Sequence, residues 1–271
     1  MEPHEKLFSV RGKVIIITGG AGFLGRAYAT FFARAGARVV LFDVLDRRIL
    51  REKVEAIFQK AKRRPWGISV DITDSKAVAA AIRAVKRRYG RIDVLVNNAA
   101  MNPIAENQAS SLQFSPYEKY SIELWQREFD IGLTGAFLVT QAVIPVMKAK
   151  RSGVIINVGS IYGSVAPDNR IYRKGKFKSI AYATVKGGLA SFSRALASYL
   201  APHGIRVNHL ILGGAYDRQD RAFVKGYSSR TMLGRMASPD DFLGAMLYLA
   251  SDASSYVTGA DIAVDGGLTA W

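Results

Sequence analysis

The sequence predicts a single α/β domain over residues 1–271, doubly wound, with a parallel seven-stranded sheet and helices on both faces. Short apolar runs and helix-length amphipathic segments alternate about seven times along the chain. The runs are almost continuously apolar, as strands are when helices bury both faces of a parallel sheet. No internal repeat, low-complexity segment or linker-like break divides the chain, and a hydrophobic fraction of 49% suits one globular core.

The first half of the chain supplies four of the expected strands. Val14 to Ile17 is a β-branched apolar run typical of a buried strand, and Thr18-Gly19-Gly20 turns the chain after it. A helix is expected over 24–35, because apolar residues recur at helical spacing until Gly36. The next expected elements are a strand at 39–42, a helix at 50–61, a strand at 68–70, a helix from its N-cap Asp74, and a strand at 92–96.

The second half continues the alternation after a polar stretch from Met101 to Tyr120. One long helix is expected through Trp125 and Phe137 to Met147. The remaining expected elements are a strand at 154–158, a helix at 181–200, a strand at 205–211, a helix from Pro239 to about Ala250, and a last strand at 262–264.

The charge balance is the unusual part of the composition. The chain has 38 Lys and Arg against 22 Asp and Glu, a formal net charge of +16. Such an excess suggests nucleic acid, an acidic membrane surface or an anionic small molecule as a partner, unless it only decorates solvated helix faces. The first ten residues lack the apolar core of a signal peptide, and no apolar run is long enough to cross a bilayer. We therefore expect a cytoplasmic protein with no membrane partner.

Residue types that bind metals are scarce. The absence of cysteine excludes disulfides, thiolate metal sites and a cysteine nucleophile. The three histidines, His4, His203 and His209, are too few and too scattered for a histidine cage, so no metal is expected.

A glycine-rich loop follows the first strand. Thr18 to Gly25 reads TGGAGFLG, with glycines at 19, 22 and 25, and it lies between a strand and a helix. Glycines let the backbone approach a pyrophosphate, and the helix N-terminus offers unpaired N–H groups and partial positive charge. The loop therefore predicts dinucleotide binding in a Rossmann-type domain.

Asp43 ends the second strand, 18 residues after Gly25. A carboxylate there accepts hydrogen bonds from the adenosine ribose hydroxyls and repels a 2′-phosphate, which favours NAD as the cofactor. Arg47 and Arg48 follow closely, and arginine accommodates that phosphate, so NADP stays open.

Three further residues form a candidate catalytic set. Tyr182 and Lys186 are four residues apart on an expected helix and therefore share a face. A lysine ammonium near a phenol lowers the phenol pKa, which suits Tyr182 for general acid–base work. Ser160 follows a buried strand, at the sheet edge where α/β proteins place ligands, and its hydroxyl can hold a reacting carbonyl.

Together these motifs resemble the short-chain dehydrogenase/reductase family from about Gly12 to Gly267. The order and spacing of the matching pieces carry the resemblance. They are TGGAGFLG, Asp43, Asp71-Ile72, NNAA from Asn97, GLTGAFL from Gly132, INVGS, YATVK, GIRVN from Gly204, and the tail pieces LASD, VTG and VDGG. The resemblance implies hydride transfer between a nicotinamide cofactor and an alcohol or ketone, without a metal, by a homo-oligomer that is commonly a tetramer or dimer.

The resemblance also implies roles for matching residues. Tyr182 would exchange a proton with the substrate oxygen, Ser160 would hold that oxygen, and Lys186 would bind the nicotinamide ribose and tune Tyr182. The implied cofactor contacts are Gly19, Gly22, Phe23, Leu24, Gly25, Asp43, Asp71, Ile72, Asn98, Ala99, Tyr182, Lys186 and Ala215.

The sequence departs from the family pattern at four places. Phe23 stands where most compact members have glycine, and Leu212 replaces the proline of the usual Pro-Gly after the sixth strand. Gly132 stands where an asparagine usually supports a water in the proton relay, which argues for altered chemistry. The separation of Ser160 and Tyr182, 22 residues, is longer than usual.

The extra segment, 165–180, contains five cations: Arg170, Arg173, Lys174, Lys176 and Lys178. Cations beside the reacting centre suit an anionic substrate such as a sugar phosphate, nucleotide sugar or acidic sugar. The candidate substrate contacts are Tyr162, Arg170, Arg173 and Arg218. SIYGSVAPDNRIY, GLTGAFL and the carboxyl-terminal SDASSYVTGADIAVDGGLTAW also resemble a subgroup linked with bacterial surface-sugar and flagellin modification of the legionaminic acid type.

We therefore predict an oxidoreductase for a sugar-derived, anionic alcohol or ketone. Two alternatives stay open. One is a reductase of the 3-oxoacyl carrier-protein type, and the other is a non-catalytic dinucleotide-binding regulator, for which Gly132 and Leu212 argue. Nucleic-acid binding is not expected, because the motifs give the chain a small-molecule redox task.

Overall fold

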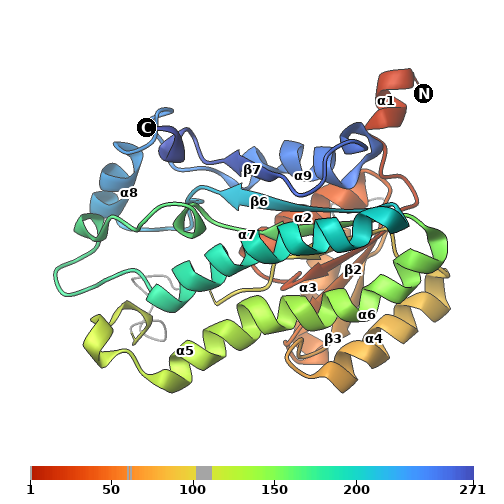
Figure 1. Cartoon of the computed structure of the whole chain (residues 1–271), viewed down its shortest axis with the longest axis horizontal. Helices are drawn as coiled ribbons and strands as arrows, with labels where there is room; N and C mark the ends of the chain where they lie inside the picture. The colour runs from red at the N-terminus through yellow and green to blue at the C-terminus, as the bar shows by residue number, and fades with distance from the viewer. Residues whose placement is uncertain (1, 60, 62, 102–111) are drawn as a thin grey trace.

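The computed structural model describes residues 2–59, 61, 63–101 and 112–271. Its centre is one seven-stranded sheet in the order β3-β2-β1-β4-β5-β6-β7, with every neighbouring pair parallel (Figure 1). The strands are β1 Val14–Thr18, β2 Arg38–Asp43, β3 Trp66–Ser69, β4 Val94–Asn97, β5 Gly153–Val158, β6 Ile205–Leu212 and β7 Asp261–Val264. The predicted fold class is confirmed.

Helices cover both faces of this sheet because successive strand residues point to opposite sides. The long helices are α2 Phe23–Arg34, α3 Arg47–Phe58, α4 Ser75–Tyr89, α6 Gly135–Lys150, α7 Ile180–Leu200 and α9 Leu243–Ala250. Ile15 and Ile17 of β1 share a core with α2, α3 and α9, whereas Val14 and Ile16 share the other core with α4, α6 and α7. In Figure 1, α6 and α7 run side by side in front of the sheet.

The strand order reverses between β1 and β4, so the loops after these two strands diverge. In a doubly wound sheet, ligands bind in the crevice that forms at such a point, outside the carboxyl ends of the strands. The fold thus directs attention to Gly19, which follows β1, and Asn98, which follows β4.

Most predicted elements differ from the observed ones only at their ends, but the long helix differs internally. It consists of α5 Ile122–Phe129, a π-helical turn at Asp130–Thr134, and α6. The π turn contains Gly132 and packs it against α7. Asp74 is the N-cap of α4, as expected, and accepts hydrogen bonds from the N–H groups of Lys76 and Ala77.

Two other elements differ from expectation. The helix expected from Pro239 begins with a 3-10 turn at Pro239–Phe242, and α9 follows it. Helix α8, Arg221–Ser228, was not expected, and the short α1, Pro3–Leu7, precedes the sheet. Residues 102–111 of the polar stretch lie outside the described residues.

By length and composition alone, one helical segment, Ile122–Lys150, is apolar enough to cross a membrane, and 39% of its most apolar window is buried. In the structure its α6 portion packs against α4, β4 and β5. Its apolar character is therefore consistent with that of a core helix.

Candidate active site

A cavity of about 850 Å³ opens at the carboxyl ends of the strands. Five successive strand ends contribute to its lining, namely Gly19 after β1, Asp43 of β2, Asn98 after β4, Ser160 after β5 and Gly213 after β6. Residues far apart in sequence meet here because all the strands are parallel and end at the same edge.

The glycine loop is built for close backbone packing. A Cβ atom on Gly25 would lie 2.2 Å from the carbonyl oxygen of Gly19, so no side chain fits there. Gly19 has φ +60°, and its Cβ would lie 3.0 Å from the Cα of Ala99. Of the predicted loop contacts, Gly19, Gly22, Phe23 and Leu24 line the cavity, whereas Gly25 is buried where α2 meets the loop. The loop thus needs its glycines for geometry as well as for access.

Helix α2 begins at the end of this loop, and no described side chain caps the N–H groups of its first turn. Its N-cap, Gly22, makes no side-chain capping hydrogen bond, and no acidic residue lies in the first turn. Free N–H groups and the helix dipole bind anions, so the described residues fit the pyrophosphate of a dinucleotide.

Thr18 and Asn98 hold the loop in place across the switch between β1 and β4. The Thr18 hydroxyl accepts hydrogen bonds from the N–H groups of Asn98 and Ala99, both at 3.0 Å. In return, the Asn98 amide donates to the Thr18 carbonyl at 2.9 Å. Asn98 and Ala99 both line the cavity, as expected.

The adenosine end of the expected cofactor path is lined by Asp43, Asp71 and Ile72. Asp43 accepts a hydrogen bond from the Ala21 N–H at 2.9 Å and one from the Leu45 N–H at 3.3 Å. Its carboxylate is thereby oriented beside the glycine loop. Arg47 and Arg48 are exposed on α3 and do not line the cavity.

Ser160, Tyr182 and Lys186 come together at the centre of the cavity wall. Ser160 lies just past β5, and its hydroxyl accepts a hydrogen bond from the Tyr162 N–H at 3.2 Å. Lys186 lies one turn further along α7, where its Nζ donates to the Val158 carbonyl at 2.6 Å. The same Nζ is 5.6 Å from the centroid of the Tyr182 ring. The three side chains can hold an oxygen and move a proton at one place.

Burial dominates the protonation equilibria of this group. It raises the pKa of Tyr182 to about 12, although the nearby Ser160 hydroxyl acts to lower it. Burial also lowers the pKa of Lys186 to about 8. The expected lowering of the tyrosine pKa by lysine is thus outweighed by desolvation of the phenolate. A positive charge bound near Tyr182 would stabilise the phenolate and lower the pKa of Tyr182.

Gly132 is fixed by packing rather than by any role in a relay. A Cβ on Gly132 would lie 2.5 Å from Cγ1 of Val185, the residue before Lys186. The asparagine that the family usually carries here has no room while Val185 keeps its position. The departure seen in the sequence is therefore built into the contact between the π turn and α7.

The four predicted substrate contacts lie in different places relative to the cavity. Arg170 pairs with Asp168 at 2.9 Å and Arg173 with Asp220 at 3.2 Å, and their side chains are 86% and 70% exposed. Neither they nor the exposed Arg218 line the cavity. The salt bridges to Asp168 and Asp220 hold Arg170 and Arg173 at the surface instead. Tyr162 does line the cavity, as predicted, and so does Ala215.

Lys178 is the cation of the extra segment that reaches the cavity. The sequence does not distinguish Lys178 from the other basic residues of that segment. It also does not single out Tyr172 and Tyr227, which line the cavity as well. The regular spacing of 178, 182 and 186 was the available signal for Lys178. The buried Glu128 behind it had no such signal, because one carboxylate in an amphipathic helix normally faces solvent.

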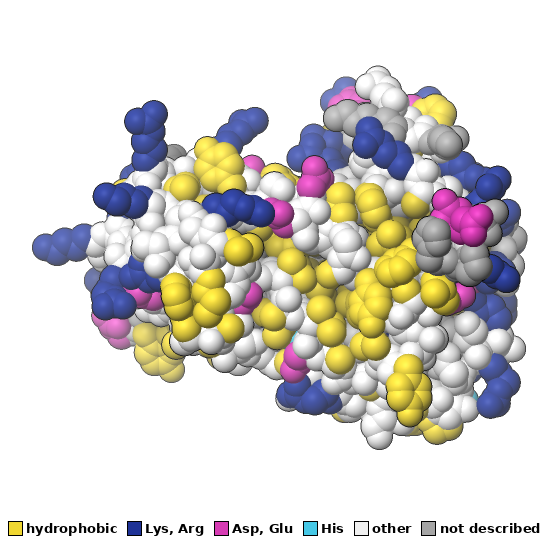
Figure 2. Space-filling view, turned by 90° about the horizontal axis from the view of Figure 1, so that it is seen from above, with side chains coloured by type: hydrophobic (Ala, Val, Ile, Leu, Met, Phe, Trp, Pro, Cys, Tyr) yellow, Lys and Arg dark blue, Asp and Glu magenta, His cyan; other side chains and the backbone are white. Residues whose placement is uncertain are grey.

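On the face drawn in Figure 2, positive charge is dispersed. Figure 2 shows Lys and Arg side chains along the outer rim of one face, with hydrophobic side chains concentrated at its centre. Nucleic-acid proteins more often gather their cations into one basic patch or stripe. On this face, the +16 charge forms no such stripe.

Comparisons with known proteins agree with the site. The sequence profile of a family described as enoyl-(acyl carrier protein) reductase matches residues 20–269. A trans-4-hydroxycyclohexanecarboxylate dehydrogenase of Sinomonas cyclohexanicum is 36% identical over 265 residues, which cover 96% of this chain and 94% of that protein.

Two solved structures are similar along almost their whole length. A short-chain dehydrogenase of Leptospira borgpetersenii with bound NAD+ matches with a TM-score of 0.83 and 31% identity, covering 99% of this chain and 96% of the other. A gluconate 5-dehydrogenase of Burkholderia cenocepacia, in complex with NADP and tartrate, matches with a TM-score of 0.86 and 28% identity, covering 99% of both.

These similarities support an enzyme over a non-catalytic regulator. The chain is an oxidoreductase that acts on CH–OH groups with a nicotinamide dinucleotide, NAD or NADP. With its seven-stranded sheet, its glycine loop and these relatives, it belongs to the short-chain dehydrogenase/reductase family.

Proposed function

We propose that Ser160, Tyr182 and Lys186 carry the reaction, the interconversion of a secondary alcohol and a ketone. The observation that carries this proposal is that the three side chains line one cavity, with Lys186 one helical turn from Tyr182 and its Nζ 5.6 Å from the centroid of the Tyr182 ring. Ser160 holds the substrate oxygen, Tyr182 exchanges the proton, and Lys186 keeps positive charge close to the phenol.

In the oxidative direction the carbinol C–H bond breaks and the C=O bond forms. A bound oxidised nicotinamide would supply the acceptor for the hydride, with its electron pair, and a positive charge near the tyrosine. As the phenolate, Tyr182 takes the hydroxyl proton of the substrate while Ser160 donates to the developing carbonyl oxygen. Solvent then takes the proton from Tyr182. Reduction follows the same path in reverse.

We assign NAD as the preferred cofactor because of Asp43. Its carboxylate lines the adenosine end of the cavity and is oriented by two backbone N–H groups. A negative charge there accepts ribose hydroxyl hydrogen bonds and repels a 2′-phosphate. The remaining cofactor contacts are the cavity-lining residues named above, with Gly25 supporting the loop from behind.

We assign the substrate to anionic, sugar-derived alcohols or ketones. Two of the similar proteins support an acidic substrate, since one is named for a hydroxycyclohexanecarboxylate and the other for gluconate and was obtained with tartrate. The sequence resemblance to the surface-sugar subgroup supports the sugar part. Tyr162 lines the cavity beside Tyr182 and is retained as a substrate contact.

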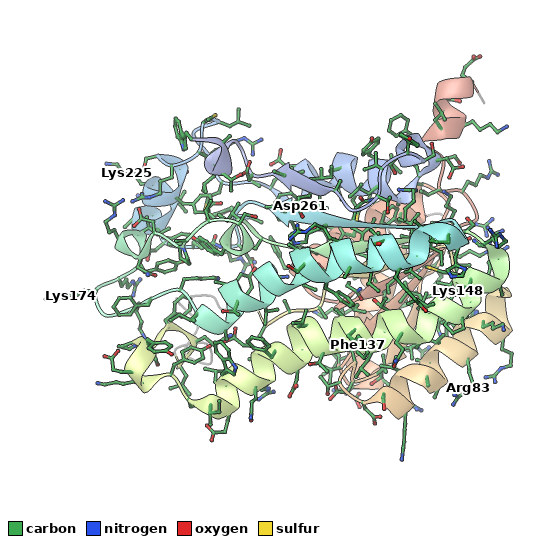
Figure 3. The ribbon with its side chains drawn as sticks, in the orientation of Figure 1. Arg83, Phe137, Lys148, Lys174, Lys225 and Asp261 are labelled. Carbon is green, nitrogen blue, oxygen red and sulfur yellow. The ribbon has the colours of Figure 1, made fainter. Side chains whose placement is uncertain are left out.

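We further propose that residues 1–271 act as one cofactor-binding domain in a cytoplasmic homo-oligomer, a tetramer or dimer. Phe137 supports the oligomer, because it is 47% exposed on α6 and its ring lies 6.4 Å from that of Phe192 on α7 (Figure 3). Phe137 and the half-buried Phe192 form the apolar part of the α6–α7 surface that we propose another copy covers.

Steady-state assays test the proposed function. Purified protein is mixed with NAD+ or NADP+ and hydroxycyclohexanecarboxylate, gluconate or cyclohexanol, and the absorbance of the reduced cofactor is followed. We expect the highest kcat/KM with NAD+ and an acid-bearing alcohol, and a loss of about 1,000-fold in Tyr182→Phe. Tyr199→Phe, on the exposed side of the same helix, is the matched control.

Two outcomes would overturn the proposal. One is no turnover of any alcohol by the wild-type protein, and the other is equal activity of Tyr182→Phe. Faster reduction of an acetoacetyl thioester with NADPH than of any ketone would favour the 3-oxoacyl carrier-protein alternative. The description of the matching family profile, which names an acyl carrier protein, supports that alternative.

A further inference from the structure

Lys178 is a second lysine beside the catalytic tyrosine. Its Nζ lies 4.1 Å from the centroid of the Tyr182 ring and 5.5 Å from that of Tyr162. The residue is 8% exposed and lines the cavity. Its backbone N–H donates to Oδ1 of Asn169 at 2.9 Å, which fixes the chain just before α7. In sequence, Lys178 lies four residues before Tyr182, and Lys186 lies four residues after it.

A buried carboxylate, Glu128 of α5, supports this lysine from behind. Glu128 is 2% exposed and accepts hydrogen bonds from Gln113 at 2.9 Å, from Ser179 at 2.9 Å and from the Tyr120 hydroxyl. Ser179 is also the N-cap of α7 and accepts from the Tyr182 N–H at 3.0 Å. The network therefore joins the start of the catalytic helix to a fixed negative charge.

The geometry leaves the lysine accessible and the carboxylate covered. Lys178 lines the cavity, whereas Glu128 does not. An anion that enters the cavity can therefore approach the ammonium without first meeting the carboxylate.

Aromatic rings surround the same end of the cavity. The Tyr172 ring packs 5.7 Å from Phe114 and 5.4 Å from Phe223, and its hydroxyl lies 3.3 Å from that of Tyr162. Apolar walls strengthen the attraction between a lysine and an anion because they exclude water. Such surroundings select for a compact substrate that carries its charge toward Lys178.

We propose that Lys178 is the anion-binding residue of the substrate site and receives a carboxylate close to the reacting carbon. The substrate class is then α- or β-hydroxy acids and the corresponding keto acids, because the Lys178 Nζ lies only 4.1 Å from the centroid of the ring whose hydroxyl exchanges the proton. The inference rests on the proposed function and deepens it by naming the residue and the position of the acid group.

The charge state of Lys178 agrees with this assignment. Burial lowers its pKa to about 7, the Lys186 charge acts in the same direction, and Glu128 opposes both. A carboxylate in the cavity would add a second negative neighbour and hold the lysine in its ammonium form. Binding of an anionic substrate thus offsets the energetic cost of burying the Lys178 charge.

Binding and selectivity test the inference separately from turnover. Malonate is titrated calorimetrically into the NADH complex of the wild type, Lys178→Met, Lys178→Arg and Lys174→Met. Lys174 lies at the outer bend of the same segment and serves as the matched control (Figure 3). We expect malonate to bind about tenfold more weakly to Lys178→Met, with Arg restoring most of the affinity and the control unchanged.

The kinetic arm compares 3-hydroxybutanoate with its methyl ester. The acid-over-ester ratio of kcat/KM should exceed one in the wild type and fall about tenfold in Lys178→Met. If Lys178→Met is unstable, the double variant Glu128→Gln/Lys178→Met removes both charges and is used instead. Equal malonate affinity in the wild type and the Met variant, or an unchanged ratio, overturns the inference. The proposed function is overturned by different results, namely no oxidation of any alcohol by the wild type or equal activity of Tyr182→Phe.

Discussion

The cofactor side and the substrate side of the cavity are built by different means. On the cofactor side, the fit depends on backbone: glycines that admit no Cβ, peptide N–H groups at the start of α2, and the Thr18–Asn98 hydrogen bonds. On the substrate side it depends on side chains, namely Tyr162, Tyr172, Lys178 and Phe223, brought together from three segments. Backbone constraints are local and leave motifs in the sequence, whereas side-chain walls arise from long-range packing and leave few.

The largest effect is expected from one methyl group added on the cofactor side, which tests whether that side depends on backbone packing. Gly25→Ala places a Cβ 2.2 Å from the Gly19 carbonyl oxygen, so the loop must shift and NAD+ affinity should fall by about 100-fold. Calorimetric titration with NAD+ measures it. Gly244→Ala is the control, because a Cβ there meets nothing within 4 Å. Affinity within threefold of wild type in Gly25→Ala would contradict a backbone-built cofactor side.

A second prediction concerns Gly132, which links the two sides through α7. Gly132→Ala should lower the free energy of unfolding by about 2 kcal/mol, since its Cβ would overlap Val185, and Tm should fall by roughly 4–8 °C. The double variant Gly132→Ala/Val185→Ala should recover part of this loss relative to additive single effects. Thermal unfolding of all four proteins gives the cycle. Strict additivity would show that the contact does not matter.

A third prediction concerns the one side chain on which the cofactor side depends for selectivity. Asp43→Asn keeps an oxygen that can accept from the Ala21 N–H but removes the charge, so the NADP-over-NAD ratio of kcat/KM should rise about tenfold. Asp46→Asn, at the N-cap of α3, is the control. An unchanged ratio would remove the basis for NAD preference.

The smallest expected effect sharpens the substrate side through pH. Lys178 loses its charge as the pH rises through about 7, so malonate affinity of the wild type should fall several-fold between about pH 6 and pH 8. Among the described residues, the groups that face Lys178 include Glu128 on α5, Tyr182 and Lys186 on α7, and Tyr162 after β5. Lys178→Arg should show a flat profile, because a guanidinium stays charged. A profile equally steep in Arg would assign the titration to another group.

The sequence predicts the fold and the cofactor side well for a physical reason. Val14 to Ile17 could only be a strand buried on both faces, and TGGAGFLG between strand and helix has few other uses. Asp74 as an N-cap and the shared face of Tyr182 and Lys186 follow from spacing alone. Each of these features is decided within a few residues.

The substrate side could not be predicted in the same way. Arg170 and Arg173 look equivalent to Lys178 in sequence, yet Asp168 and Asp220 hold them at the surface while α5 and α7 enclose Lys178. Glu128 becomes a buried partner only because Ser179 and Tyr120 are brought to it from distant segments. The π turn at Gly132 likewise depends on Val185, on another helix.

The central claim is that this site moves a hydride between a carbinol carbon and nicotinamide, with Tyr182 taking the proton. It is tested most directly by incubating the protein and NAD+ with 3-hydroxybutanoate deuterated at the carbinol carbon and analysing the reduced cofactor by mass spectrometry. The account predicts that deuterium appears on the nicotinamide ring with the wild type and that the rate falls about 1,000-fold with Tyr182→Phe. Reduced cofactor without deuterium, or the same rate without the tyrosine hydroxyl, would contradict it.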